Sequence, residues 1–289
     1  MKVLVVGGSG FVGRALTARL LDAGHDVEIW DRALLPEQPG LRCHAVDLLA
    51  TDPLPGPEGR PWDAALHLAA YSVPGMAWTQ ELIMANLRMT ARVFDHLADQ
   101  APGCRAIFAS SAFVYAPSPA PLRETDPLGA THPYALSKEL GEIWALSRRD
   151  QLRVFIVRPF NLLGPGMAAG LLVPDLLQRI QAGESPILMR GRDDIRDFLD
   201  WRDAIEAYLC LLDVEAPSGT IWNLCSGRPT KVSRLVETLV QAHGQTTPVQ
   251  FADAAGEPMV GDPSRLMAAT GWQPRHSLAD TAAAIVAGR

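Results

Sequence analysis

A tyrosine and a lysine stand four residues apart in the segment Tyr134-Ala-Leu-Ser-Lys138. On a helix this spacing puts both side chains on one face, with their Cβ atoms roughly 5–6 Å apart. A positive charge beside a phenol favours the phenolate, so it lowers the phenol's pKa from its usual value of about 10. The pair therefore predicts that Tyr134 is a general acid or base whose pKa is lowered by Lys138.

A glycine-rich turn comes at the start of the chain. Residues 2–6 predict an apolar strand and residues 11–23 a helix, with glycines between them. Glycine at such a turn permits a tight bend and the close approach of a dinucleotide pyrophosphate, which backbone N–H groups and the helix N-terminus bind. The residues expected to bind this part of a cofactor are Gly7, Gly10, Phe11, Val12 and Gly13.

The choice of dinucleotide depends on Asp31, which ends the second predicted strand eighteen residues after Gly13. A carboxylate there accepts hydrogen bonds from the adenosine ribose and repels a 2′-phosphate, whereas the adjacent Arg32 can pair with that phosphate. The pattern favours NAD(H) and leaves NADP(H) open. Asp47 and Leu48 are expected to reach the adenine, with a simple turn as the alternative.

Apolar runs alternate with helical patterns through the first half of the chain. Strands are expected at residues 27–30, 64–68, 106–109 and 154–157, and helices at 82–98 and 134–147. This alternation predicts an α/β protein with a parallel sheet covered by helices on both faces.

The elements become shorter after residue 161. Helices are expected at residues 173–182, 203–212, 232–242 and 278–286, and strands at 197–199 and 221–224. Residues 53–61 and 163–170 predict loops, and Asp262-Pro263 predicts the cap and first residue of one more helix.

Composition excludes several classes of function. A net charge of −6 argues against general affinity for nucleic acids, and the chain has no apolar run of the ~20 residues that span a membrane. The short apolar N-terminus runs straight into glycines and predicts a strand. The four scattered cysteines predict reduced thiols and no metal site, so a cytoplasmic location is expected.

Several segments together resemble the motifs of the extended short-chain dehydrogenase/reductases, the NAD-dependent epimerase/dehydratase family. In the first half they are Gly7-Gly-Ser-Gly-Phe-Val-Gly13, His67-Leu-Ala-Ala70, Ser110-Ser-Ala-Phe-Val-Tyr115, Tyr134-Ala-Leu-Ser-Lys138 and Arg158-Pro-Phe-Asn161. The second half is similar to reductases of GDP-linked 4-keto-6-deoxymannose and to related nucleotide-sugar epimerases and dehydratases. Its matching segments are Arg196-Asp-Phe-Leu-Asp-Trp-Arg-Asp203, Trp222-Asn-Leu-Cys-Ser-Gly227 and Thr270-Gly-Trp-Gln-Pro274.

The resemblance implies a Rossmann domain and a smaller C-terminal α/β substrate domain. Residues 1–161 are expected to form the first, with some later segments returning to it, and residues 162–289 mainly the second. It also implies a homodimer, because residues 82–98 and 134–147 resemble the helices that pair two subunits in this superfamily.

The resemblance also assigns roles to individual residues. Ser111 matches the hydroxyl that binds the reacting group, Tyr134 the general acid/base, and Lys138 the residue that binds the nicotinamide ribose. Ala69 and Ala70 are expected to lie against the cofactor, and Asn161 and Arg196 to bind substrate, with a surface salt bridge as the alternative for Arg196. Asn86 is expected either to anchor a proton-relay water or to fill a helix interior, and His67 to pack within the fold.

The sequence departs from the family in two places. Dehydratases of this group carry acidic residues directly after the catalytic hydroxyl, where this chain has Ala112 and Phe113, so dehydration is not expected. Relatives also carry an arginine that grips the substrate diphosphate, whereas residues 251–258 contain none. Other arginines could compensate, namely Arg190, Arg192, Arg196 and Arg265.

The expected function is therefore an NAD(P)-dependent oxidoreductase that transfers hydride to or from a sugar carbon, most simply by reducing a 4-keto nucleotide-deoxysugar. A nucleotide-sugar 4-epimerase that keeps NAD bound would use the same residues, and the missing arginine leaves a ketoreductase of a non-sugar metabolite open. A redox-sensing regulator would have lost Ser111, Tyr134 or Lys138, and all three are present.

Overall fold

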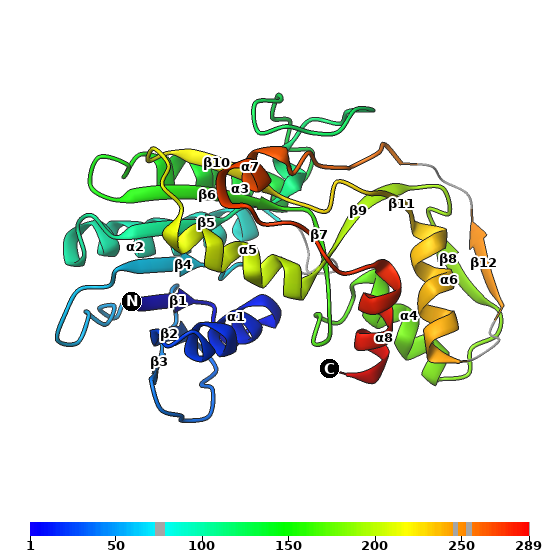
Figure 1. The fold of residues 1–289 in the computed structure, drawn as a ribbon, viewed down its shortest axis with the longest axis horizontal. Helices are drawn as coiled ribbons and strands as arrows, with labels where there is room; N and C mark the ends of the chain where they lie inside the picture. Colours follow the sequence, from blue (N-terminus) through cyan, green and yellow to red (C-terminus); the bar gives the residue numbers. More distant parts are fainter. Residues whose placement is uncertain (73–78, 245–247, 253–255, 289) are drawn as a thin grey trace.

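The computed structural model describes residues 1–72, 79–244, 248–252 and 256–288. A large sheet and its helices form one part of the molecule, and two small sheets with three helices form the other (Figure 1). The chain returns from the small sheets to the large sheet at β10, Thr220–Leu224. This strand pairs with β6, Arg153–Pro159.

The large sheet has seven parallel strands in the order β10-β6-β5-β4-β1-β2-β3. Its central strands are apolar and buried, as expected for a parallel sheet covered on both faces. The order reverses direction between β1 and β4, which is where doubly wound sheets bind ligands. The remaining bounds are β1, Lys2–Val6; β2, Asp26–Asp31; β3, Leu41–Ala45; β4, Ala64–His67; and β5, Arg105–Ala109.

Two hydrophobic clusters lie on opposite faces of this sheet. On one face α1, Phe11–Asp22, and α5, Trp201–Asp213, pack together, and on the other α2, Gln80–Gln100, packs against α3, Pro133–Leu146. The 3-10 turn η1, Ala112–Val114, follows β5, and α7, Ser264–Thr270, lies against β10. The fold is therefore a Rossmann-type doubly wound α/β architecture.

The smaller part carries a three-stranded sheet in the order β11-β9-β7 and a two-stranded sheet of β12 and β8. Its helices α4, α6 and α8 bury their apolar faces in a third cluster. The bounds are β7, Asn161–Leu163; α4, Leu172–Gln181; β8, Ile187–Arg190; β9, Ile195–Asp200; β11, Pro229–Lys231; α6, Val232–His243; β12, Val249–Ala252; and α8, Leu278–Ala287.

Every helix and strand expected by residue range is present, with each end matching or shifted by at most two residues. The expected loop at 53–61 is confirmed, but the loop expected at 163–170 begins one residue too early because Leu163 still belongs to β7. The expected start of α7 is one residue early: Pro263 is the N-cap, and the Asp262 carboxylate accepts the Ser264 N–H at 2.9 Å. The sequence patterns did not predict β3, β7, β8, β11 or β12.

Helix α3 approaches the end of β5 very closely. A Cβ at Gly141 would lie 2.6 Å from Cζ of Phe108, so only glycine fits there without movement of the ring. The same ring lies 5.0 Å from the Lys138 ammonium. The contact between Gly141 and Phe108 therefore sets the depth at which α3 places its polar side chains.

We predict that Gly141→Ala lowers the free energy of unfolding by about 1–3 kcal/mol, because the added methyl overpacks the contact with Phe108. Helix propensity alone would predict a gain of up to about 1 kcal/mol. Urea denaturation followed by circular dichroism measures the change. Glu139→Ala, on the same helix, is the control and should change stability by less than about 0.5 kcal/mol; a stabilised Gly141→Ala variant would contradict the contact.

Candidate active site

The glycine-rich turn between β1 and α1 leaves no room for side chains. Gly7 has a φ of +89°, and a Cβ there would lie 2.7 Å from the Ala69 nitrogen. A Cβ at Gly13 would lie 2.2 Å from the Gly7 carbonyl oxygen. Helix α1 begins directly after this turn at Phe11. The turn thus exposes backbone N–H groups and a helix N-terminus to a bound anion.

A cavity of about 420 Å³ opens beside this turn, at the carboxyl ends of β1, β2 and β4. All the residues expected to hold the adenosine and pyrophosphate line it, namely Gly7, Gly10, Phe11, Val12, Gly13, Asp31, Arg32, Asp47, Leu48, Ala69 and Ala70. Residues that the sequence did not single out complete the walls: Ser9, Trp30, Val46, Leu68, Tyr71, Ser72 and Met89. A size of a few hundred Å³ and a glycine cradle that a Cβ would fill fit a dinucleotide.

Asp31 and Arg32 occupy one end of the cavity. The Asp31 carboxylate accepts the Ser9 N–H at 2.9 Å and so braces the glycine turn. The Arg32 guanidinium lies 5.7 Å from the centre of the Tyr71 ring, a cation–π contact on the cavity wall. A carboxylate and a guanidinium therefore both face the place where a ribose or its phosphate would bind.

Asn86, on α2, clamps the segment after β4. Its side-chain oxygen accepts the Tyr71 N–H at 2.8 Å, and its amide donates to the Tyr71 carbonyl and to the Ser137 hydroxyl. These contacts use both amide hydrogens and one side of the oxygen. In this structure Asn86 shapes the cavity wall and ties it to α3, as a polar residue of the helix interior.

Ser111 and Tyr134 meet at the start of α3. Ser111 follows β5, is buried, and accepts the Phe113 N–H at 3.2 Å. Burial raises the pKa of Tyr134 to about 12, and a hydrogen bond with the Ser111 side chain opposes that rise. The two hydroxyls are therefore in contact, as their expected roles require.

Lys138 lies in a nearly dry environment on the same face of α3. Its ammonium donates to the Ala109 carbonyl at 2.7 Å and lies 5.9 Å from the centre of the Tyr134 ring. Burial lowers the pKa of Lys138 to about 8, and the negative charge of Glu142 opposes that change. The ammonium is thus largely charged near neutral pH and loses its proton as the pH rises through 8.

The expectation that Lys138 lowers the pKa of Tyr134 is wrong for this structure. Removal of the phenol from water disfavours the phenolate more than neighbouring groups favour it, so the pKa rises. The expectation considered the charge of Lys138 and left out the burial of both groups. Tyr134 is consequently a protonated phenol at neutral pH, which suits a proton donor.

His67 packs inside the fold as expected. It is 1% exposed, its Nε2 lies 3.2 Å from the Thr90 hydroxyl, and its ring contacts Phe94 and Phe108. Burial and the charge of Lys138 lower its pKa to about 3. His67 is therefore neutral and takes no direct part in proton transfer.

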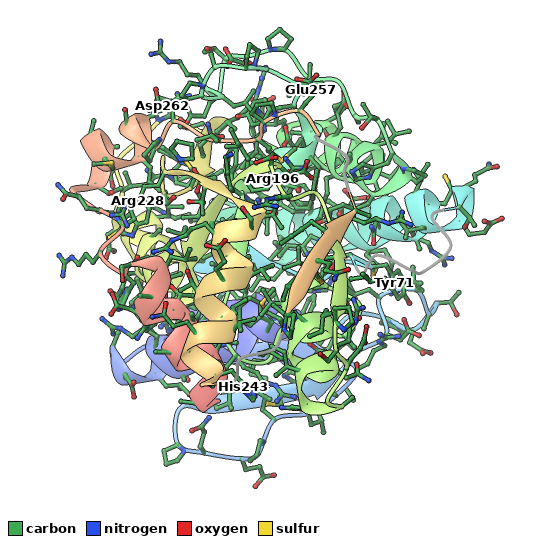
Figure 2. All side chains as sticks on the ribbon, turned by 90° about the vertical axis from the view of Figure 1, so that its right-hand side faces the viewer. Tyr71, Arg196, Arg228, His243, Glu257 and Asp262 are labelled. Atoms are coloured by element: carbon green, nitrogen blue, oxygen red, sulfur yellow. The ribbon has the colours of Figure 1, made fainter. Side chains whose placement is uncertain are left out.

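The two expected substrate residues lie in the smaller part of the molecule and do not line the cavity described above. Asn161 is half-buried, and its amide donates to the Asp197 carbonyl at 2.9 Å. Arg196 pairs with Asp194 at 3.1 Å and donates to the Glu257 carbonyl at 2.9 Å, and both Arg196 and Glu257 can be found in Figure 2. The salt bridge named as the alternative for Arg196 is present.

The other arginines face outward. Arg190, Arg192 and Arg265 are exposed, and Arg265 stacks at 5.5 Å on the Trp222 ring. None of them lines the dinucleotide cavity.

A metal site and a membrane span would each leave a recognisable arrangement of side chains. Over the described ranges, no group of three or more His, Cys, Asp or Glu side chains is arranged to hold a metal ion. In the same part of the chain, every helix is too short or too polar to cross a bilayer. Cys104 and Cys225 are buried, and Cys43 and Cys210 are half-buried.

Residues 3–225 match the model of the NAD dependent epimerase/dehydratase family. The chain is 31% identical to the GDP-6-deoxy-D-mannose reductase of Pseudomonas aeruginosa, over 99% of this chain and 96% of that protein.

Solved structures agree with this fold. RMD from Pseudomonas aeruginosa complexed with NADPH has a TM-score of 0.84 at 27% identity and covers 99% of this chain and 98% of that chain. MoeE5 in complex with UDP-glucuronic acid and NAD has a TM-score of 0.87 at 24% identity and covers 100% and 98%. The chain therefore belongs to the NAD-dependent epimerase/dehydratase family, the extended short-chain dehydrogenase/reductases.

Proposed function

We propose that this enzyme reduces the 4-keto group of a nucleotide-activated deoxysugar with NADH or NADPH. The observation that carries the proposal is the meeting of Ser111, Tyr134 and Lys138 at the carboxyl end of β5, in a sheet whose carboxyl edge also carries a dinucleotide cavity. Similarity to a GDP-6-deoxy-D-mannose reductase along nearly the whole chain supports the substrate class.

The side chains supply proton transfer and orientation. Ser111 donates a hydrogen bond to the carbonyl oxygen, and Tyr134 delivers its phenolic proton as negative charge builds on that oxygen. Lys138 holds its ammonium beside the phenol and binds the nicotinamide ribose. A bound nicotinamide supplies the hydride, which is the redox chemistry that no side chain provides.

Reduction requires a protonated acid beside the carbonyl oxygen. A phenol with a pKa of about 12 is protonated before the reaction and is ready to donate. Dehydration finds no support, because Ala112 and Phe113 occupy the positions where an acid and a base would be needed. Neither side chain carries a titratable proton.

The cofactor proposal rests on Asp31. Its carboxylate lines the cavity and favours NAD(H), while Arg32 on the same wall can accept the extra phosphate of NADP(H). Residues 7–13 would hold the pyrophosphate. The planar rings of the cofactor would pack against Ala69, Ala70, Asp47 and Leu48.

The substrate would bind where the smaller part of the molecule, mainly residues 162–289, faces the Rossmann sheet. We propose Asn161 and Arg196 as its contacts. Arg196 would have to exchange Asp194 for a phosphate, and the segment that holds the second arginine in relatives has none here. For this reason a ketoreductase acting on a non-sugar metabolite is an alternative to the proposed reductase.

A 4-epimerase would use the same three catalytic residues. Such an epimerase would retain bound NAD through purification and would show no net consumption of the cofactor. The family description includes epimerases, so cofactor retention decides between the two activities.

We also propose a homodimer formed through α2 and α3. Met84 on α2 and Ile143 on α3 are 56% and 62% exposed, a large apolar area on two neighbouring helices. Leu136 on α3 is also exposed. A second copy that covers this face would form a four-helix bundle.

The catalytic assignment is tested with 4-keto nucleotide sugars and each cofactor. Wild-type protein should oxidise NADH or NADPH in the presence of at least one such substrate. Tyr134→Phe should lower kcat by about 10²–10⁴-fold, because the proton donor is lost, while fluorescence titration shows nearly unchanged cofactor binding. Undiminished turnover in this variant would remove Tyr134 from the mechanism.

The cofactor assignment is tested by Asp31→Asn, which keeps an acceptor for the Ser9 N–H but removes the charge. We expect the Kd ratio of NADPH to NADH to fall about tenfold or more, because a like-charge contact with the 2′-phosphate disappears. Asp47→Asn, on the same cavity, is the control and should leave the ratio unchanged. An equal effect of the two substitutions would show that Asp31 does not choose the cofactor.

The dimer is tested by sedimentation at micromolar concentration. The wild-type protein should have the mass of two chains, and Ile143→Glu the mass of one, because a carboxylate would be buried in the interface. Leu188→Glu is a matched control, since Leu188 is 58% exposed on β8, away from α2 and α3. A wild-type mass of one chain would rule the dimer out.

A further inference from the structure

Glu142 is a buried carboxylate that the proposed mechanism does not use. It lies on α3, is 3% exposed, and accepts two hydrogen bonds from the Arg158 guanidinium, at 2.9 and 2.7 Å. It also accepts the Ser110 hydroxyl. Two donors of the Arg158 guanidinium and the Ser110 hydroxyl therefore hold this carboxylate in one orientation. Ser110 is the residue directly before Ser111.

The carboxylate lies one helical turn beyond Lys138. Residues four apart on a helix share a face, so the ammonium and the carboxylate are neighbours. The hydrogen bonds of Glu142 go to Arg158 and Ser110, while the bond of Lys138 goes to the Ala109 carbonyl. The charge of Glu142 therefore acts on Lys138 through space in a poorly solvated site, where such an interaction is strong.

The other titratable groups around Lys138 supply no negative charge at neutral pH. Tyr134 on α3 is protonated, and His67 on β4 is neutral. Arg158 on β6 is positive and lies behind the carboxylate. Glu142 is thus the negative group that the described elements place near this buried ammonium.

We propose that Glu142 is a positioning residue that supplies the negative charge keeping Lys138 an ammonium in its buried site. Its hydrogen bond with Ser110 also ties Ser110, and through it Ser111, to the same helix. The proposal rests on the proposed role of Lys138. Arg158 fixes the carboxylate, because its guanidinium also stacks at 4.7 Å on the Tyr115 ring. The Tyr115 hydroxyl in turn donates to Asn223 at 2.6 Å, which anchors the assembly to β10.

A purely structural ion pair is the competing explanation. A buried pair of this kind destabilises the fold when one partner is removed, whichever partner it is. The two explanations differ in what happens to Lys138. Loss of Glu142 removes an attractive charge from the ammonium, whereas loss of Arg158 leaves that charge in place.

The chain has only three lysines, Lys2, Lys138 and Lys231, so each can be followed by NMR of protein labelled with ¹³C at the lysine side chain. Lys138→Met assigns the Lys138 signal. In Glu142→Gln we expect the midpoint of the Lys138 titration to fall by roughly 0.5–1 pH unit, because the ammonium loses its neighbouring carboxylate. In Arg158→Gln, which breaks the same pair and keeps the carboxylate, the midpoint should stay or rise.

A fall of equal size in both variants, or no fall in Glu142→Gln, would overturn the proposal. Circular dichroism verifies that each variant is folded. If a single variant does not fold, Glu142→Gln combined with Arg158→Met removes both buried charges and should still lower the midpoint. The titration needs no turnover, so it can be measured even if the proposed activity is not found. Conversely, an unchanged midpoint would argue against the role of Glu142 but not against the proposed activity.

Discussion

The site depends on the burial of an ammonium and a phenol between α3 and the end of β5. Gly141 lets α3 come close enough for Phe108 to cover Lys138, and the Ala109 carbonyl accepts a hydrogen bond from the Lys138 ammonium. The same loss of solvent moves the pKa of Lys138 down to about 8 and that of Tyr134 up to about 12. At neutral pH the pair is thus a cation beside a protonated phenol, which is the combination that proton delivery to a developing alkoxide needs.

This arrangement connects the two ends of the site. Asn86 ties the cavity wall at Tyr71 to α3 through Ser137, and Ser111 joins α3 to the end of β5. The wall that would contact the nucleotide and the helix that carries the acid are therefore held by one network of hydrogen bonds. A substitution that shifts α3 as a whole is therefore expected to affect cofactor binding and proton transfer together, whereas one that only removes the phenol hydroxyl is expected to affect proton transfer alone.

Sequence patterns predicted the parallel sheet and the residues of the cavity well, for a physical reason. Central strands such as Lys2–Val6 are buried throughout and apolar after the first residue, because both faces are covered. Glycine at positions 7 and 13 is required because a Cβ there would make contacts below 3 Å. The missed strands lie at edges or in small sheets. Ile187–Arg190 alternates buried and exposed residues over only four positions, and Leu41–Ala45 is largely polar or half-exposed, so neither run differs enough from a loop.

Electrostatics was less predictable than residue identity. The types and spacing of Tyr134 and Lys138 were visible in the chain, but the pKa of the phenol depends on how much water the fold excludes. The salt bridge between Arg196 and Asp194 likewise depends on how the turn before β9 is folded. Neither the pKa of the phenol nor this salt bridge can be read from a local motif, because both depend on how the chain is arranged in the folded protein.

The most direct test of the account is a crystal structure of the protein with NADH or NADPH bound. We predict the pyrophosphate at the turn of residues 7–13, the Lys138 ammonium on the nicotinamide ribose, and the Tyr134 hydroxyl beside the reactive face of the nicotinamide. A nicotinamide placed away from Tyr134, or a cofactor bound outside the cavity at β1 and β4, would contradict the account.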